Sequence, residues 1–176
     1  ALRDKLDERA VHARTGCLFH TSYLPARILW LKETEPDLCR QVTRWMSFAE
    51  YVFLRLFGTP ACSHSMASGT GMFNLNALQW DEEVLQALGV SPDELGTLVK
   101  SSQSFSGPGQ SYAARLGRLA DVPWYPALGD GACSNVGSGC VTPERPAVMI
   151  GTSGAMRTVW AVDSLTPPWG LWGYRV

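Results

Sequence analysis

Apolar residues in the first half of the chain recur at helical spacing between well-marked turns. Pro25 can open a helix that carries Ile28 and Leu29, because proline is favoured in the first turn of a helix. Residues 34–37 combine a capping box with a proline at the first helical position, so a second helix is predicted to run to about Thr43. This pattern predicts short helices joined by turns.

The next predicted helix covers residues 47–57 and ends before Gly58. Its apolar residues surround it almost completely, so we expect it to be buried on most sides. Glu50 is then an acid on a mostly apolar helix. Such an acid either pairs with a base or faces a cleft, and pairing within the structure is the more common reason.

The pattern continues through the middle of the chain. Residues 81–90 and 91–99 predict two more helices, the second opened by a capping box at 91–94. Residues 101–110 are a turn-rich connector, and residues 112–119 predict another amphipathic helix. We interpret this part as scaffold.

The pattern changes after Val122. Residues 123–128 predict a strand, and residues 130–138 predict the start of a helix made of small residues. Residues 147–150 and 156–162 predict two strands that flank a turn. We therefore expect a domain boundary near residues 121–140, with domains at 1–128 and 129–176.

Composition excludes several classes of protein. With 45% hydrophobic residues, 18% charged residues and a net charge of -1, the chain has no electrostatic bias toward nucleic acid or an anionic membrane. Its five cysteines are odd in number and scattered, which favours reduced thiols. The most apolar run, 45–57, is too short to span a bilayer, and the chain opens with charged residues instead of a signal peptide. We expect a cytoplasmic protein.

Two segments of the second part carry candidate chemistry. Asp130 follows an apolar stretch and stands between two glycines, where its carboxylate can face a cleft. Residues 151–154 (Gly-Thr-Ser-Gly) can turn successive backbone N–H groups toward one anion. Taken singly, an acid between glycines is more often a turn residue or helix cap, and the tetrapeptide is more often only a tight turn. Together they indicate phosphoryl transfer, which needs a base and groups that neutralise phosphate oxygens.

Other motifs are absent or weak. The pattern GxxxxGK[ST] does not occur, no glycine triplet has dinucleotide-binding spacing, and there is no GxSxG segment. No Cys or His pair has the spacing of a structural zinc site, so no metal ligand is predicted. For His20, a structural histidine at the start of a helix is a more common interpretation than a histidine that contacts a ligand.

Four blocks of the sequence carry a resemblance to a known family. They are TGCLFHTSYLPARILWLKETEPDL, WMSFAEYVFLRLFG, HSMASGTGMFNLNALQWDEEVLQALGV and GDGACSNVGSGCVTPERPAVMIGTSGAMR. In this order they resemble the central part of an FGGY-family carbohydrate kinase, and within that family bacterial gluconokinases most. The resemblance implies two actin-like (RNase H-like) α/β domains with the active site between them. This chain would supply the later, helix-rich part of the first domain and the opening hairpin of the second.

The resemblance also implies roles for individual residues. Asp130 matches the catalytic base that deprotonates the sugar hydroxyl, and Gly151, Thr152, Ser153 and Gly154 match the turn that holds the terminal phosphates of the nucleotide.

Substrate contacts are implied at four further positions. His20 and Ser22 match the loop before the family's first signature helix, and Glu50 with Tyr51 matches its acidic-aromatic pair. The chain departs from the signature at Arg27, where the family usually has lysine.

The implied cofactors are ATP and Mg²⁺, with the main Mg²⁺ acid expected outside this chain, so that the chain alone is expected to be inactive. The implied reaction is phosphorylation of a sugar or sugar acid, with gluconate converted to 6-phosphogluconate. An FGGY kinase of another specificity (xylulose, glycerol) and a non-catalytic remnant that binds a sugar or a partner both stay open. A homodimer stays open as well.

Overall fold

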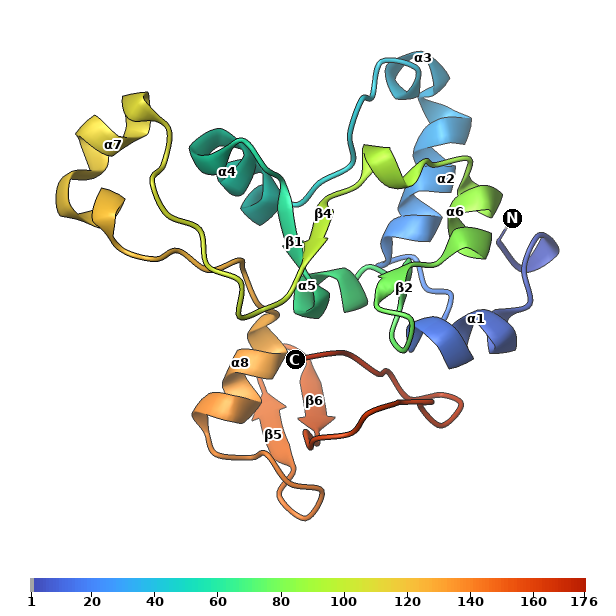
Figure 1. The fold of residues 1–176 in the computed structure, drawn as a ribbon. Coiled ribbons are helices and arrows are strands. Elements are labelled where there is room, and N and C mark those ends of the chain that lie inside the picture. The colour runs from blue at the N-terminus through green and yellow to red at the C-terminus, as the bar shows by residue number, and fades with distance from the viewer. Residues whose placement is uncertain (1) are drawn as a thin grey trace.

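The computed structural model describes residues 2–176 as short helices around three two-stranded sheets (Figure 1). The α-helices are α1 (Glu8–Thr15), α2 (Leu24–Thr34), α3 (Pro36–Cys39), α4 (Phe48–Phe57), α5 (His64–Ser68), α6 (Glu82–Leu88), α7 (Gln110–Leu116) and α8 (Asp130–Gly137). The strands are β1 (Ala61–Ser63), β2 (Phe73–Asn74), β3 (Gln79–Trp80), β4 (Thr97–Val99), β5 (Ala147–Ile150) and β6 (Gly154–Arg157). Three 3-10 helices span Leu2–Asp4, Pro92–Glu94 and Gly117–Asp121. Across residues 2–176 no helix combines the length and apolar character needed to cross a bilayer.

Helix α4 begins and ends where the sequence predicts. Ser47 accepts a hydrogen bond from the backbone N–H of Glu50, and the Glu50 carboxylate accepts one from the Ser47 N–H, which completes a capping box. Gly58 ends the helix in the left-handed region, at φ 74°. The predicted burial is wrong, however: Phe48 is 81% exposed, and only one apolar residue of the helix, Phe53, is buried.

The central feature of the first part is a parallel strand pair. β1 pairs with β4 in the register Cys62 to Leu98, and all three residues of β1 are buried. The prediction of a helix over 91–99 is wrong, because the capping box at Ser91 opens only a single 3-10 turn, after which Leu95 is extended and the chain enters β4. Pairing with a strand about 35 residues earlier therefore overrides the local helix signal.

A continuous hydrophobic core joins α1, α2, α6 and the β2–β3 pair. Its fully buried members include Phe73, Met72, Leu75 and Val84. A second, smaller cluster lies between α4 and the sheet around Phe53, and aromatic rings of the connector extend it. The buried residues of both clusters lie within the first 99 positions, and Leu165 of the C-terminal segment packs against the larger cluster.

Two further predictions about the first part need correction. α3 ends at Cys39 and not near Thr43. The capping box predicted at residues 34–37 does not form, because the Thr34 hydroxyl donates to the carbonyl of Trp30 on α2 and the helix starts after Glu35 without a side-chain cap.

The second part begins with a connector that contains α7, as predicted, and the 3-10 helix after it. The strand predicted over 123–128 is absent, and one bridge from Trp124 to Phe105 stands in its place. Pro123 and Pro126 lack the N–H that a strand ladder needs. The predicted helix at 130–138 and the hairpin after it are confirmed, although β6 starts at Gly154 and ends at Arg157.

After β6 the chain returns to the first part without regular structure (Figure 1). The backbone N–H of Gly173 donates to Gly16 at 2.9 Å, and His12 Nε2 lies 2.7 Å from the carbonyl of Leu171. Arg175 donates to the Leu75 carbonyl at 2.8 Å and to the Asp163 carbonyl at 3.1 Å. The aromatic C-terminal segment is thus packed against α1 and the turn after β2.

Candidate active site

Asp130 is the first residue of α8. The preceding segment is held by two serines at the junction of β1 and α5: Ser63 donates to the Ala127 carbonyl at 2.6 Å, and the N–H of Gly129 donates to Ser65 Oγ at 3.1 Å. The Asp130 side chain is exposed and accepts a hydrogen bond from the N–H of Gly131. The carboxylate therefore lies at the N-terminal end of α8, beside the backbone N–H groups of its first turn.

The Gly-Thr-Ser-Gly segment forms the turn between β5 and β6. One backbone bond closes it, from the N–H of Gly151 to the carbonyl of Ser153 at 2.9 Å. Thr152 and Ser153 are exposed, and within residues 2–176 neither their N–H groups nor their hydroxyls have a hydrogen-bond partner. Free N–H and O–H donors on one turn suit phosphate oxygens. Figure 1 shows this turn at the end of the hairpin where α8 begins.

A buried asparagine fastens α8 to the hairpin. Asn135 has no exposed surface, and its Nδ2 donates to the carbonyl of Arg157 at 3.1 Å and to that of Cys140 at 3.4 Å. Its Oδ1 has no partner. Because the bond to Arg157 joins α8 directly to β6, the position of Asp130 relative to the turn depends on this side chain.

Arg157 itself reaches back along α8. A Cβ placed on Gly131 would lie 2.8 Å from Arg157 Nε and 3.1 Å from Cζ, so the guanidinium rests against the backbone of Gly131. A larger residue at position 131 would displace the guanidinium from this place. Arg157 was missed in the sequence, where an arginine at the end of a strand carries no special signal.

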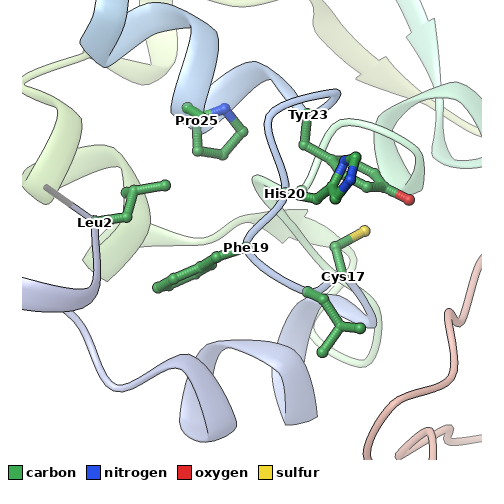
Figure 2. A pocket seen from close by; sticks show the side chains of 9 residues that line it. Leu2, Cys17, Phe19, His20, Tyr23 and Pro25 are labelled. Carbon is green, nitrogen blue, oxygen red and sulfur yellow. The ribbon is translucent and has the colours of Figure 1, made fainter.

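His20 and Ser22 lie in the exposed loop before α2. The N–H of Ser22 donates to His20 Nδ1 at 3.2 Å, so the loop is closed by its own side chain. Figure 2 shows His20 and Tyr23 near Cys17 at a small cavity of about 10 Å³. That volume holds about one water molecule and no sugar.

Tyr23 connects this loop to the C-terminal segment. Its hydroxyl lies 2.5 Å from the hydroxyl of Tyr174, and burial raises the pKa of both phenols. The hydrogen bond with Tyr23 and the charge of Arg157 oppose the rise at Tyr174. Burial also raises the pKa of the neighbouring Cys17 thiol to about 12, so this thiol stays protonated. Tyr174 thus joins the C-terminal segment to the residue that precedes α2.

Glu50 and Tyr51 adjoin each other in sequence but occupy different environments. The Glu50 carboxylate is buried, accepts the capping bond from Ser47, and lies against Gly96. Among residues 2–176 no Lys or Arg forms an ion pair with it, so its burial is explained by the helix cap and not by pairing with a base. Tyr51 is 44% exposed, and its hydroxyl accepts a hydrogen bond from Arg55 at 2.9 Å.

The structure therefore brings some predicted site residues together and leaves others apart. Asp130 and the 151–154 turn belong to one unit made of α8, β5 and β6. Next to the His20 loop, the Tyr23 hydroxyl bonds to Tyr174 of the C-terminal segment, whereas Glu50 and Tyr51 lie on α4 in the first part.

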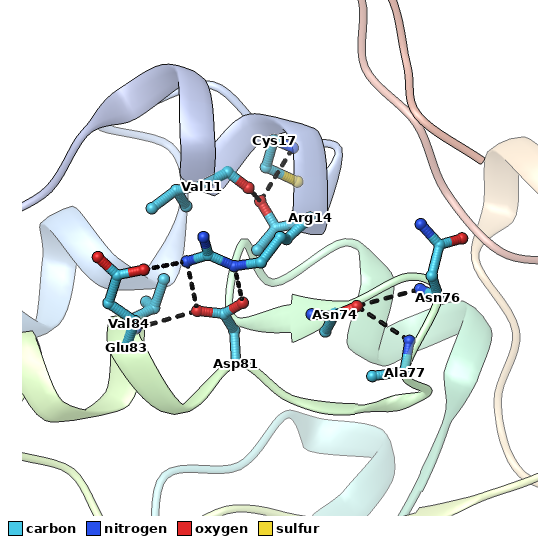
Figure 3. A network of polar contacts seen from close by, with 10 residues as sticks. Val11, Arg14, Cys17, Asn74, Asn76, Ala77, Asp81, Glu83 and Val84 are labelled. Carbon is cyan, nitrogen blue, oxygen red and sulfur yellow. Dashed lines mark hydrogen bonds and ion pairs between the residues drawn. The ribbon is translucent and has the colours of Figure 1, made fainter. Parts of the chain in front are cut away.

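A charged cluster between α1 and α6, formed by Arg14, Asp81 and Glu83, has a structural role (Figure 3). Arg14 Nε lies 2.7 Å from Asp81 Oδ2, and a second guanidinium nitrogen lies 2.5 Å from a Glu83 oxygen. Asp81 also caps α6 by accepting from the N–H of Val84. An open groove of about 380 Å³ lies beside this cluster, but these charges are already paired. Within residues 2–176 no group of three His, Cys, Asp or Glu side chains could hold a metal ion.

Comparison with known proteins identifies the family. The profile described as the FGGY family of carbohydrate kinases, N-terminal domain, matches residues 1–137. The Gluconokinase of Bacillus subtilis is 33% identical over 158 residues, which is 90% of this chain and 31% of that protein. The Xylulose kinase of Escherichia coli is 30% identical over 151 residues, or 85% of this chain and 31% of that protein. The chain thus spans about a third of the length of these curated relatives.

Solved structures give the same result. A gluconate kinase from Lactobacillus acidophilus superposes with a TM-score of 0.80 at 29% identity, covering 86% of this chain and 31% of that one. A ligand-bound xylulose kinase from the same organism gives the same values. The predicted fold class, an actin-like α/β fold present only in part, is confirmed. Because the family profile covers most of the chain and the relatives agree with it, the chain belongs to the FGGY family of carbohydrate kinases.

Proposed function

We propose that the chain is part of an ATP-dependent carbohydrate kinase that phosphorylates gluconate to 6-phosphogluconate. Gluconate is preferred because the Bacillus subtilis Gluconokinase is more similar in sequence, at 33%, than the Escherichia coli Xylulose kinase, at 30%. The proximity of xylulose kinases in fold makes a neutral sugar such as xylulose the second candidate. In this proposal residues 1–128 belong to the sugar-binding domain and residues 129–176 open the second domain. The protein acts in the cytoplasm, in keeping with five free cysteines.

One observation carries the proposal: Asp130 lies at the start of α8, and α8 is fastened to the hairpin whose turn offers free N–H and hydroxyl groups. Asp130 accepts the proton of the sugar hydroxyl while that oxygen bonds to the terminal phosphorus of ATP. The bond from phosphorus to the ADP oxygen breaks, and ADP leaves with the electron pair. Thr152 and Ser153 orient phosphate oxygens through their free donors.

The residues present fit the phosphates of ATP better than they fit Mg²⁺. The turn at 151–154 has uncommitted donors, whereas no metal-binding group of three acids, histidines or cysteines exists among residues 2–176. Magnesium neutralises phosphate charge when it is bound, and it commonly uses one or two carboxylates and several waters. We therefore propose that its main acid lies outside residues 1–176.

The base assignment is tested by Asp130→Asn in the complete protein. Loss of the proton acceptor should lower kcat by about 10²–10⁴-fold and leave the Kd for ATP unchanged. Asp121→Asn, at an exposed acid on the 3-10 helix before the site, is the matched control and should keep full turnover. Equal turnover in the two variants would refute the role of Asp130.

A second experiment tests whether residues 1–176 need the rest of the protein for activity, and it uses residues 1–176 alone. A coupled assay with ATP, Mg²⁺ and gluconate should show no turnover above background. Turnover close to that of a complete gluconokinase would overturn this proposal. The alternative of a sugar-binding module makes a different prediction. In that case both residues 1–176 and the complete protein would bind gluconate in calorimetry, and the complete protein would show no turnover.

A further inference from the structure

Arg157 differs from the other half-buried cations of the molecule. Four lysines and arginines among residues 2–176 are half-buried, namely Arg14, Lys32, Arg157 and Arg175. Arg14 is paired with acids, Lys32 donates to two backbone carbonyls, and Arg175 donates to several. In the described chain the Arg157 guanidinium has neither a hydrogen-bond acceptor nor an ion-pair partner. No Arg157 nitrogen is among the buried side-chain atoms of residues 2–176 that lack a partner, so its donors are open to solvent and to a ligand.

Both the backbone and the side chain of Arg157 contact α8. The Asn135 side chain holds the carbonyl of Arg157, and the side chain lies on Gly131, directly after Asp130. Its charge also acts on Tyr174, which bonds to Tyr23 beside the His20 loop. The free donors of Arg157 therefore lie against Gly131, next in sequence to the proposed base.

We propose that Arg157 binds the carboxylate of the sugar-acid substrate and selects acids over neutral sugars. This inference rests on the proposed kinase function. A sugar acid carries one negative charge that a neutral sugar lacks, and a planar guanidinium matches a carboxylate with two parallel hydrogen bonds. The unoccupied donors of Arg157 supply that match, and Gly131 gives the guanidinium room to lie beside α8.

The inference separates two kinds of effect. Removal of Arg157 should weaken recognition of the carboxylate and leave proton transfer at Asp130 intact. An arginine that acted on the transferred phosphoryl group would instead affect every substrate equally, through kcat.

The test compares gluconate with gluconamide, a neutral analogue of similar size, in the complete protein. Arg157→Ala should lower kcat/KM for gluconate on the order of 100-fold, mainly through KM, and change that for gluconamide less than about 3-fold. Arg157→Lys keeps the positive charge but loses the planar pair of N–H donors, so it should lower kcat/KM for gluconate by about 10-fold. Arg145→Ala, at an exposed arginine before β5, is the control and should change neither.

Calorimetry makes the test independent of turnover. Gluconate affinity should fall in Arg157→Ala while ATP affinity and circular dichroism stay unchanged. Equal losses for gluconate and gluconamide, unchanged gluconate affinity, or no gluconate binding to the unmodified protein would each overturn the assignment. If Asp130 is not the base, the result is different: Asp130→Asn would keep full turnover, and Arg157→Ala would still weaken gluconate binding.

Discussion

Residues 2–99 and residues 129–157 are stabilised in different ways. The first region buries a continuous apolar core, with Phe73 and Val84 among its fully enclosed side chains. The structure describes every residue of the second region, and only one of them, the polar Asn135, is buried. Ile150 and Met156 are 86% and 73% exposed. Because the proposed base and phosphate turn lie in the second region, fold stability and chemistry depend on different parts of the chain.

Truncation of a core side chain should have the largest effect on stability. Phe73→Ala removes a ring with no exposed surface and should lower the free energy of unfolding by about 3–5 kcal/mol. Ile150→Ala, in the exposed face of β5, should change it by less than about 0.5 kcal/mol. Urea denaturation of the two variants measures both values, and equal losses would contradict the contrast between the regions.

A methyl group at Gly96 should have the next largest effect. A Cβ there would overlap Glu50 Oε1 and lie 2.8 Å from the Cβ of Cys62 on β1, so the Glu50 carboxylate and the local backbone must both shift. Gly96→Ala should lower the free energy of unfolding by about 1–3 kcal/mol. Gly137→Ala, at a helical position of α8 with nothing within 4 Å, should be neutral or stabilising by about 0.4–1 kcal/mol. A Gly96→Ala protein as stable as the Gly137→Ala protein would show that the tight contact is absent.

Loss of the buried asparagine should act locally in the second region. Asn135→Ala removes the bonds to the carbonyls of Arg157 and Cys140 and should cost about 1–2 kcal/mol. Hydrogen exchange should accelerate in β5 and β6 but not in β1 and β4. Ser134→Ala, one position earlier on the exposed face of α8, is the control. Unchanged exchange in the hairpin would mean that another contact fastens it to α8.

Sequence reasoning predicted the elements whose signals are local. The capping box at Ser47 located α4, and the glycine-rich turn located the β5–β6 hairpin. It missed the parallel pairing of β1 with β4, because three-residue strands far apart in sequence carry no periodic signal and their burial comes from packing. It also overestimated the burial of Phe48, since an apolar helix surface does not specify what covers it.

The candidate site divides in the same way. Asp130 and the 151–154 turn were singled out in the sequence as candidates, because an acid and a small-residue turn after apolar segments have a chemical meaning, and their roles stay a prediction. Arg157 and Tyr174 were not, because their relation to the site depends on one side chain crossing α8 and on the C-terminal segment returning to α1. Such relations are properties of tertiary packing.

Acidification should have the smallest effect on the free energy of unfolding. It tests the ion pair of Arg3 with Glu8 in the first region. Glu8 accepts hydrogen bonds from Arg3 Nε at 2.7 Å and from the N–H of Phe19 at 2.9 Å. The hydrogen bond from Arg3 is the main cause that holds the Glu8 pKa below its usual 4.5, against the opposing effect of burial. Since the folded pKa is lower than the unfolded one, the contribution is fully present above pH 4.5 and is lost as the pH falls through the folded pKa.

Glu8→Gln should therefore be less stable than the unmodified protein at pH 7, by less than about 1 kcal/mol because Arg3 is 68% exposed. That difference should shrink as urea denaturation is repeated from pH 5 down to pH 3. Glu144→Gln, at an exposed acid between α8 and β5, should show a constant difference near zero over the same range, because no partner is lost there. A constant Glu8→Gln difference would contradict this assignment, because it would show that the stabilisation does not depend on the charge that Arg3 recognises.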